Sequence, residues 1–169
     1  MPEKLREFAY EDGPLPIEAE QTISQPYIVA AMIDAAGIAP GDKVLEIGAG
    51  SGYAAAVMGR IAEAVVAVER QSALARLARE RMARLGYDNV RIVEGDGSGG
   101  LPEEAPFDAV VVAAAAAEAP AALLEQLAEG GRLVIPVGPP SGQRLRIYGA
   151  DGRFREGVAC RFVPLVRDC

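Results

Sequence analysis

The chain has 169 residues, half of them hydrophobic, which suits a single compact domain with a full core. Its formal net charge of −7 and pI near 4.7 make nucleic acid an unfavourable stable partner, because a phosphate-rich ligand normally meets a basic face. The sequence has no apolar run long enough to span a membrane, no signal-peptide stretch at its start, and no histidine for a nucleophile triad or a metal site.

The two cysteines, Cys160 and Cys169, lack the spacing of metal ligands. We therefore expect free thiols in a reducing cytoplasm rather than a disulfide, and no bound metal. No sequence feature indicates an assembly, so a monomer is the default expectation.

The N-terminal part predicts a loop followed by one helix. Residues 1–9 suit a short helix or an arm, and residues 10–17 hold two prolines and a glycine, which predicts a loop. A helix is expected over residues 26–36, with Pro26 in its first turn, Ser24 as its N-cap and Gly37 at its end.

A strand, a glycine turn and a helix are predicted next. An apolar, β-branched run gives a strand over residues 43–48, and a helix follows from residue 53 to about 63. The glycines between them read Gly-x-Gly-x-Gly, with Glu46 before them. A dinucleotide fingerprint needs a small residue where Tyr53 stands, which disfavours an NAD-binding dehydrogenase. The form found here is typical of methyltransferases that use S-adenosylmethionine (SAM).

The next strands end in acidic residues. Residues 64–69 predict the second strand, and Glu69 at its end is placed to accept the hydroxyls of a ribose. A helix over 72–85 with Gly86 as its C-cap follows, and its arginines are expected to be a solvated face. After a strand over 90–93, Asp96 in a glycine turn is a candidate acceptor for an adenine amino group.

The remaining elements complete an α/β pattern. We expect a central strand over 107–113, a helix over 120–128 ended by Gly130 and Gly131, and a strand over 132–137. From residue 143 apolar residues alternate, with a hairpin turn at Asp151-Gly152, which predicts antiparallel strands to residue 165. The fold class is thus a doubly wound, Rossmann-like sheet, mostly parallel, with antiparallel C-terminal strands.

The candidate cofactor residues all fall near the carboxyl ends of parallel strands, where such sheets bind ligands. We expect one domain, with residues 1–42 covering the site, residues 43–138 forming the cofactor-binding core and residues 139–169 forming the antiparallel strands. The predicted cofactor-binding residues are Glu46, Gly48, Ala49, Gly50, Ser51, Gly52, Tyr53, Glu69, Arg70, Asp96, Gly97 and Ala113.

The chain resembles the protein-L-isoaspartate O-methyltransferase family along nearly its whole length. The most specific matching segment is Thr22-Ile-Ser-Gln-Pro26, because the glycine loop is shared by most SAM methyltransferases. The other matching segments are residues 9–17, 21–27, 44–53, 95–97, 123–127, 130–138 and 161–165.

The resemblance implies a SAM-dependent protein-repair enzyme that esterifies the α-carboxylate of isoaspartyl residues and releases S-adenosylhomocysteine (SAH). It implies that Ser24 lies between the methyl donor and the substrate carboxylate. This chemistry suits a chain without histidine, because a carboxylate is already ionised at pH 7 and needs no general base. The substrate-binding residues expected from the resemblance are Thr22, Ile23, Gln25, Phe162, Val163 and Leu165.

The sequence departs from the family pattern at three places. Glu18-Ala19-Glu20 replaces a glycine pair, few residues precede Tyr10, and Ala113 and Ala117 replace a threonine and a proline. Two alternatives therefore stay open: a methyltransferase of the same fold with another acceptor, and a SAM-binding module without activity.

Overall fold

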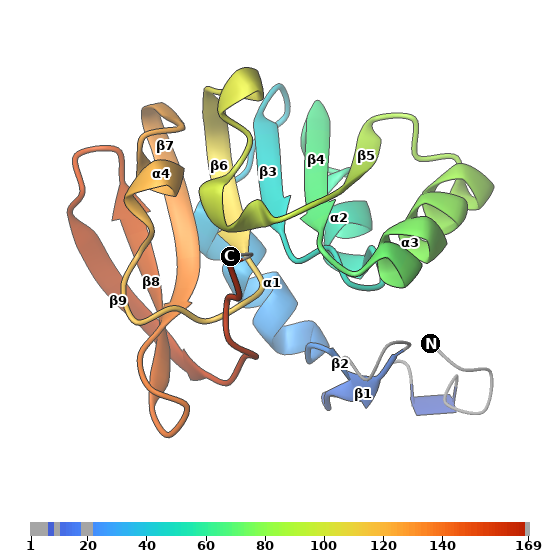
Figure 1. The fold of residues 1–169 in the computed structure, drawn as a ribbon, viewed down its shortest axis with the longest axis horizontal. Helices are drawn as coiled ribbons and strands as arrows, with labels where there is room; N and C mark the ends of the chain where they lie inside the picture. Colours follow the sequence, from blue (N-terminus) through green and yellow to red (C-terminus); the bar gives the residue numbers. More distant parts are fainter. Residues whose placement is uncertain (1–6, 9–10, 18–21, 168–169) are drawn as a thin grey trace.

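The computed structural model describes residues 7–8, 11–17 and 22–167, which form a seven-stranded sheet with helices and turns on both faces and a separate two-stranded sheet (Figure 1). The predictions for residues 1–9, for Glu18 to Glu20 and for Cys169 lie wholly or mostly outside the described residues.

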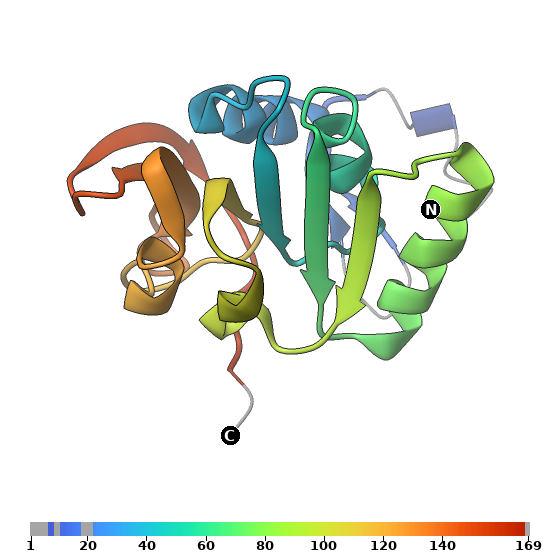
Figure 2. The same cartoon turned by 90° about the horizontal axis from the view of Figure 1, so that it is seen from above.

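The sheet has the strand order β5-β4-β3-β6-β7-β8-β9. Its first five strands pair in parallel, and β7, β8 and β9 pair antiparallel, which confirms the predicted fold class. Figure 2 shows the C-terminal strands at one end of the molecule and α3 at the other. The strands are β3 (Lys43–Ile47), β4 (Ala64–Glu69), β5 (Val90–Glu94), β6 (Phe107–Val112), β7 (Leu127–Val137), β8 (Gln143–Gly149) and β9 (Phe154–Cys160).

Four helices pack against this sheet in the described part of the chain. Buried residues of α1 (Pro26–Ala36), α2 (Tyr53–Met58) and α3 (Ser72–Leu85) cover one face, where they join side chains such as Val44 and Ala109. The other face carries the short helix α4 (Ala121–Leu124), whose Leu123 packs with Leu45, Phe107 and Val110. Because both faces are covered, the central strands are mostly apolar, and the buried Glu46 in β3 is an exception.

Two helix ends match the predictions and one cap does not. Gly37 and Gly86 end α1 and α3 in the left-handed conformation, as expected from their lack of a side chain. The N-cap of α1 is Gln25 rather than Ser24, and its side chain makes no capping bond. A capping side chain would accept an N–H of the next helical residues, and here the Tyr27 N–H donates to Asp12 Oδ1 at 3.2 Å instead.

Two predicted helices are shorter than expected, and in each case a side-chain amide takes backbone carbonyls at or just beyond the helix end. Helix α2 ends at Met58 instead of residue 63, and Asn89 Nδ2 donates to the carbonyls of Gly59 (2.8 Å) and Ala62 (3.2 Å). Helix α4 ends at Leu124 instead of residue 128, and Gln126 Nε2 donates to the carbonyl of Ala122 at 2.7 Å. In a longer helix the backbone N–H of residue 126 would make that bond.

The glycines after α4 lie inside a strand instead of ending a helix. Strand β7 begins at Leu127, and its register against β6 shifts between Phe107 and Ala109. Gly131 sits at this irregularity, where a Cβ would lie 3.0 Å from the carbonyl oxygens of residues 107, 108 and 128. A bulge of this kind needs a residue without a side chain.

Both ends of the chain differ from the predicted loop and strand. Leu15–Pro16 (β1) and Thr22–Ile23 (β2) pair as a small antiparallel sheet that was not predicted. Strand β9 ends at Cys160, and residues 161–167 leave the sheet instead of extending the strand to residue 165.

Candidate functional site

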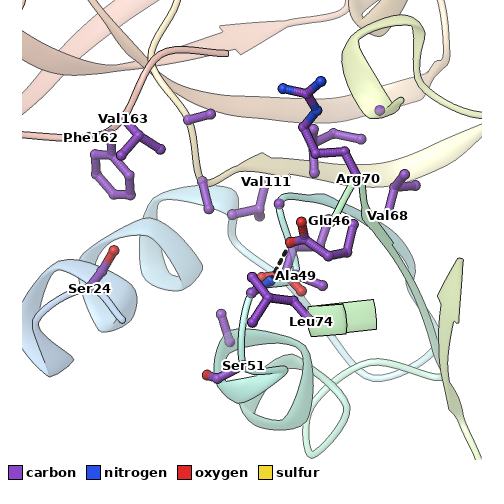
Figure 3. Close-up of a pocket in the computed structure, with 18 of the residues that line it drawn as sticks. Ser24, Glu46, Ala49, Ser51, Val68, Arg70, Leu74, Val111, Phe162 and Val163 are labelled. Carbon is purple, nitrogen blue, oxygen red and sulfur yellow. Dashed lines mark hydrogen bonds between the residues drawn. The ribbon is translucent and has the colours of Figure 1, made fainter. Parts of the chain in front are cut away.

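A cavity of about 410 Å³ opens at the carboxyl ends of β3, β4 and β6 (Figure 3). Its volume and its place in the sheet are those of ligand pockets in α/β proteins. The structure brings together at this cavity the predicted residues Thr22, Ile23, Ser24, Glu46, Gly48, Ala49, Gly50, Ser51, Tyr53, Glu69, Arg70, Asp96, Gly97, Ala113, Phe162, Val163 and Leu165.

Two predicted residues do not line the cavity. Gln25 turns its side chain to the N-terminal segment, where Nε2 donates to the carbonyl of Asp12 at 3.0 Å. Gly52 faces α3, and a Cβ at this position would lie 3.0 Å from Met82 Cε. Both residues therefore contact neighbouring elements instead of the cavity.

The glycine loop between β3 and α2 is held in a conformation that only glycine adopts readily. Gly50 and Gly52 have positive φ values of 54° and 82°. From α3, an Arg81 guanidinium N–H donates to the carbonyl of Ser51 at 3.2 Å. The loop thus passes close to α3 on one side and forms the floor of the cavity on the other.

Glu69 ends β4 and fixes the glycine loop with its carboxylate. The side chain is buried, with Oε2 accepting the Gly50 N–H at 2.8 Å and Oε1 accepting the Gln71 N–H at 2.9 Å. Since a carboxylate offers about four acceptor sites, each oxygen retains capacity toward the cavity. The residue both shapes the loop and presents acceptors to a ligand.

Glu46, on the neighbouring strand β3, is the less satisfied of the two acids. It is 1% exposed, and its Oε2 has no hydrogen-bond partner among the described residues. Burial, and then the nearby Glu69 carboxylate, raise the pKa of Glu46 well above its usual value. A buried acceptor of this kind calls for a cationic or hydrogen-bonding partner, which a ligand in the cavity would supply.

Asp96 and Gly97 form the wall that follows β5. The Asp96 carboxylate accepts the Ser98 N–H at 2.8 Å and so orders the short 3₁₀ turn Gly97–Gly99. Gly97 packs on the end of β3, where a Cβ would lie 2.8 Å from Ile47 Cγ2. This close packing lets the backbone, rather than a side chain, face the cavity.

The opposite wall is built from residues 22–24 and from residues 162–166. Ser24, between β2 and α1, is half-buried, and its hydroxyl makes no hydrogen bond with a described residue. Figure 3 shows Ser24 with Phe162 and Val163 on one side, and Glu46 with Ala49 on the other. The C-terminal segment is held over the cavity by Ala115, whose N–H donates to Val163 (2.8 Å) and whose carbonyl accepts from Leu165 (2.7 Å).

Sequence reasoning missed the apolar part of the lining, because polar and glycine positions carry the recognisable signals. Val111 had a usable signal, since it lies two residues before Ala113 in the predicted strand 107–113 and was therefore expected on the same face. The other apolar lining residues outside the predicted set come mainly from α1, the strand ends and the C-terminal segment: Ile17, Val29, Met32, Ile33, Ile47, Ala54, Val68, Leu74, Ala114, Pro164 and Val166.

Two classes of feature are absent from the part of the chain that the structure describes. No helix there is long and apolar enough to cross a membrane. No cluster of three or more His, Cys, Asp or Glu side chains is arranged there to hold a metal ion.

Comparison with known proteins matches the whole chain to one family. The family model described as protein-L-isoaspartate(D-aspartate) O-methyltransferase covers residues 1–169. The chain belongs to this family. A relative from Pelobacter propionicus, named protein-L-isoaspartate O-methyltransferase 2, is 57% identical over 167 residues, which are 96% of this chain and 74% of the relative.

Solved structures of the same family have the same fold. One protein-L-isoaspartate O-methyltransferase has a TM-score of 0.84 and 34% identity over 94% of this chain, which spans about half, 54%, of that longer chain. A Plasmodium falciparum structure assigned to the family contains SAH and has a TM-score of 0.82, with 28% identity over 96% of this chain and 84% of its own.

Proposed function

We propose that this protein is a SAM-dependent methyltransferase that esterifies the α-carboxylate of L-isoaspartyl residues in damaged proteins or peptides. One observation carries the proposal. A single cavity joins a wall of buried acids and glycine backbone to a wall that contains Ser24 and the segment from Phe162 to Leu165. Membership of the family over the full chain supports the same activity.

The residues on the strand-end wall suit SAM. Glu69 and Asp96 offer acceptors for the ribose hydroxyls and the adenine amino group, and the glycine loop brings backbone close to the ligand. The unpartnered Oε2 of Glu46 suits the positive charge of SAM. When bound, SAM supplies a methyl group on a positively charged sulfur, which is an activated leaving group.

The Ser24 wall suits a carboxylate substrate. An isoaspartyl α-carboxylate is ionised at neutral pH, so no residue has to remove a proton from it. The Ser24 hydroxyl is free to donate to one carboxylate oxygen and leave the other in line with the methyl group. Such positioning supplies up to about 7–11 kcal/mol of barrier reduction in favourable cases.

Apolar side chains from α1 and the C-terminal segment exclude water around this contact. Met32 and Ile33 are buried beneath it, and Phe162 and Val163 form the rim on the Ser24 side. A dry site strengthens the hydrogen bond from the Ser24 hydroxyl and protects the methyl donor from hydrolysis.

We also expect the enzyme to be a monomer that acts in the cytoplasm on protein or peptide chains. Residues 1–42 are expected to cover the site, residues 43–138 to bind the cofactor and residues 139–169 to form the antiparallel strands. Its net charge of −7 supports protein rather than nucleic acid as the partner, and the free Cys160 is consistent with a reducing compartment.

A calorimetric titration with SAH, followed by a transfer assay on the same sample, tests the activity. We expect saturable SAH binding and transfer of labelled methyl from SAM to an isoaspartyl peptide as a base-labile ester. The same peptide with a normal aspartyl residue is the control. SAH binding with equal or no transfer to the two peptides would refute the proposed acceptor, and no SAH binding would refute the proposed cofactor.

A further inference from the structure

Two buried glutamines lie outside the cavity, and each is bonded by its side chain to a segment that forms one wall. Gln126 lies between α4 and β7, and Gln143 begins β8; each is 5% exposed. A buried amide must have its donors and acceptor satisfied, so the groups that it bonds to are held firmly.

Gln126 anchors the end of the turn that follows β5. Its Oε1 accepts the Leu101 N–H at 2.8 Å, and its Nε2 donates to the Gly99 carbonyl at 2.7 Å. Its own carbonyl accepts the Phe107 N–H at 2.8 Å, which ties the residue into the sheet. Gly100 has a φ of 72°, and a Cβ there would collide with the Gln126 amide. The turn is thus shaped to fit this one side chain.

This turn leads directly to the cofactor side of the cavity. Gly95, Asp96 and Gly97 line the cavity, and the Asp96 carboxylate accepts the Ser98 N–H. The Gly100 N–H donates to the Gly97 carbonyl at 2.9 Å, so the anchored end of the turn is bonded to its lining end. Any displacement at residues 99–101 is therefore passed to Asp96.

Gln143 anchors the opposite wall with an equivalent pair of bonds. Its Oε1 accepts the Phe162 N–H at 2.6 Å, and its Nε2 donates to the Phe162 carbonyl at 3.1 Å. The backbone of Gln143 pairs with Cys160 at the end of the β8–β9 ladder. The side chain therefore extends the ladder by one residue and directs the chain toward Ala115 and the cavity rim.

We propose that Gln126 and Gln143 are positioning residues for opposite sides of the site, Gln126 for the SAM side and Gln143 for the acceptor side. This inference rests on the proposed function. Loss of the Gln126 amide loosens the turn that carries Asp96, and loss of the Gln143 amide loosens the segment from Phe162 to Leu165. The two defects are separable because the anchored segments do not share a wall.

Substitution by methionine tests this division, since methionine has a similar shape and none of the amide hydrogen bonds. We expect Gln126→Met to weaken SAH binding about tenfold and to change the KM for an isoaspartyl peptide less than about twofold. Gln143→Met should raise the KM for the isoaspartyl peptide about tenfold and change SAH affinity less than about twofold. Each variant is the matched control for the other, and equal losses in both parameters for both variants would overturn the proposal.

Hydrogen exchange on the ligand-free variants gives a readout independent of activity. Faster exchange should be confined to residues 95–101 and α4 in Gln126→Met, because the same amide also bonds the Ala122 carbonyl, and to residues 162–166 in Gln143→Met. Exchange that is unchanged, or faster throughout the protein, would contradict the local anchoring. Gln126→Asn and Gln143→Asn keep an amide that is one methylene shorter and introduce no buried charge, which preserves the test if a methionine variant does not fold.

The two levels of the proposal fail in different ways. A wrong function would appear as wild-type protein without SAH binding or peptide methylation, whatever the exchange pattern. A wrong assignment of the glutamines would appear as an active wild type whose variants lack the segment-specific exchange.

Discussion

Two buried carboxylates, Glu46 and Glu69, face the same cavity from neighbouring strands, and their hydrogen bonding differs. Glu69 has a backbone N–H on each oxygen, whereas Glu46 Oε2 has no partner among the described residues. Burial and the Glu69 charge raise the pKa of Glu46 in the ligand-free protein. A bound cation would favour the ionised form and lower that pKa again.

This difference predicts proton release on binding. SAH carries an ammonium group, so SAH binding should release up to one proton at pH values between the Glu46 pKa of the complex and the higher pKa of the free protein. Affinity should rise with pH across that interval. Calorimetry in buffers with different ionisation enthalpies measures the release, and Glu46→Gln should abolish it. Equal release from Glu46→Gln and wild type would place the titrating group elsewhere.

The hydroxyl group of Ser24 is the basis of a second prediction about a single side chain. Removing a hydrogen bond to a charged partner costs about 1.5–3 kcal/mol, so Ser24→Ala should lower kcat/KM for an isoaspartyl peptide by roughly 10- to 100-fold. SAH affinity should stay within about twofold of wild type, since the hydroxyl serves the acceptor. Ser24→Thr keeps the hydroxyl and is the matched control. Steady-state kinetics in which alanine and threonine lose activity equally would argue against a donor role.

At the level of elements, the glycine loop depends on α3 as well as on its own strand. Gly52 has a positive φ and packs against Met82 and Ala78, whereas Gly86 has a similar φ of 71° with open space around its Cβ position. A comparison of alanine substitutions at Gly52 and Gly86 therefore distinguishes backbone strain, which both positions share, from side-chain crowding, which only Gly52 has.

Alanine at these positions should therefore have unequal effects. Gly86→Ala should cost about 1–2 kcal/mol of unfolding free energy from backbone strain alone and leave SAH binding unchanged. Gly52→Ala should lose a further 1–3 kcal/mol, roughly, from overpacking and should also weaken SAH binding by displacing the loop. Urea unfolding and SAH titration of both variants measure this, and unchanged SAH affinity in Gly52→Ala would show that α3 does not fix the loop.

The regular elements could be predicted from the sequence because their signals are local. Helix α3 and strand β4 have the predicted bounds, because the spacing of their apolar residues and the glycine that ends α3 lie within or next to each segment. The short ends of α2 and α4 could not be predicted, because they depend on Asn89 and on the side chain of Gln126. The small β1–β2 pairing and the path of residues 161–167 also depend on contacts between distant segments.

In the candidate site, too, residues whose positions follow from the topology could be predicted, and residues that depend on distant contacts could not. Acids and glycines at strand ends have positions that the topology dictates, so Glu69, Asp96 and the glycine loop were predictable. Placing Gln25 and Gly52 required knowledge of which neighbour each one meets. Gln126 and Gln143 carry no sequence signal for a functional role, because a glutamine is recognisable as an anchor only once its partners are known.

At the scale of the whole molecule, the cavity is lined by Ile17 and residues within 22–33 from the N-terminal part, by strand ends and by residues 162–166, so ligand binding should stabilise the entire fold. At about 100 times its dissociation constant, SAH should add about 2.7 kcal/mol to the unfolding free energy. Thermal unfolding with and without SAH should show a higher Tm that depends on SAH concentration, and adenosine is a weaker-binding control. A Tm that does not change with SAH would contradict a folded, competent cofactor site.

The central claim is that this cavity directs a methyl group to one kind of oxygen atom. Mass spectrometry can localise that methyl on a peptide that contains an isoaspartyl residue, a normal aspartyl residue and a lysine, after incubation with SAM. We expect a methyl ester on the isoaspartyl α-carboxylate and on no other group of the peptide. A methyl on the lysine or the normal aspartyl side chain, or an unmodified peptide, would contradict it.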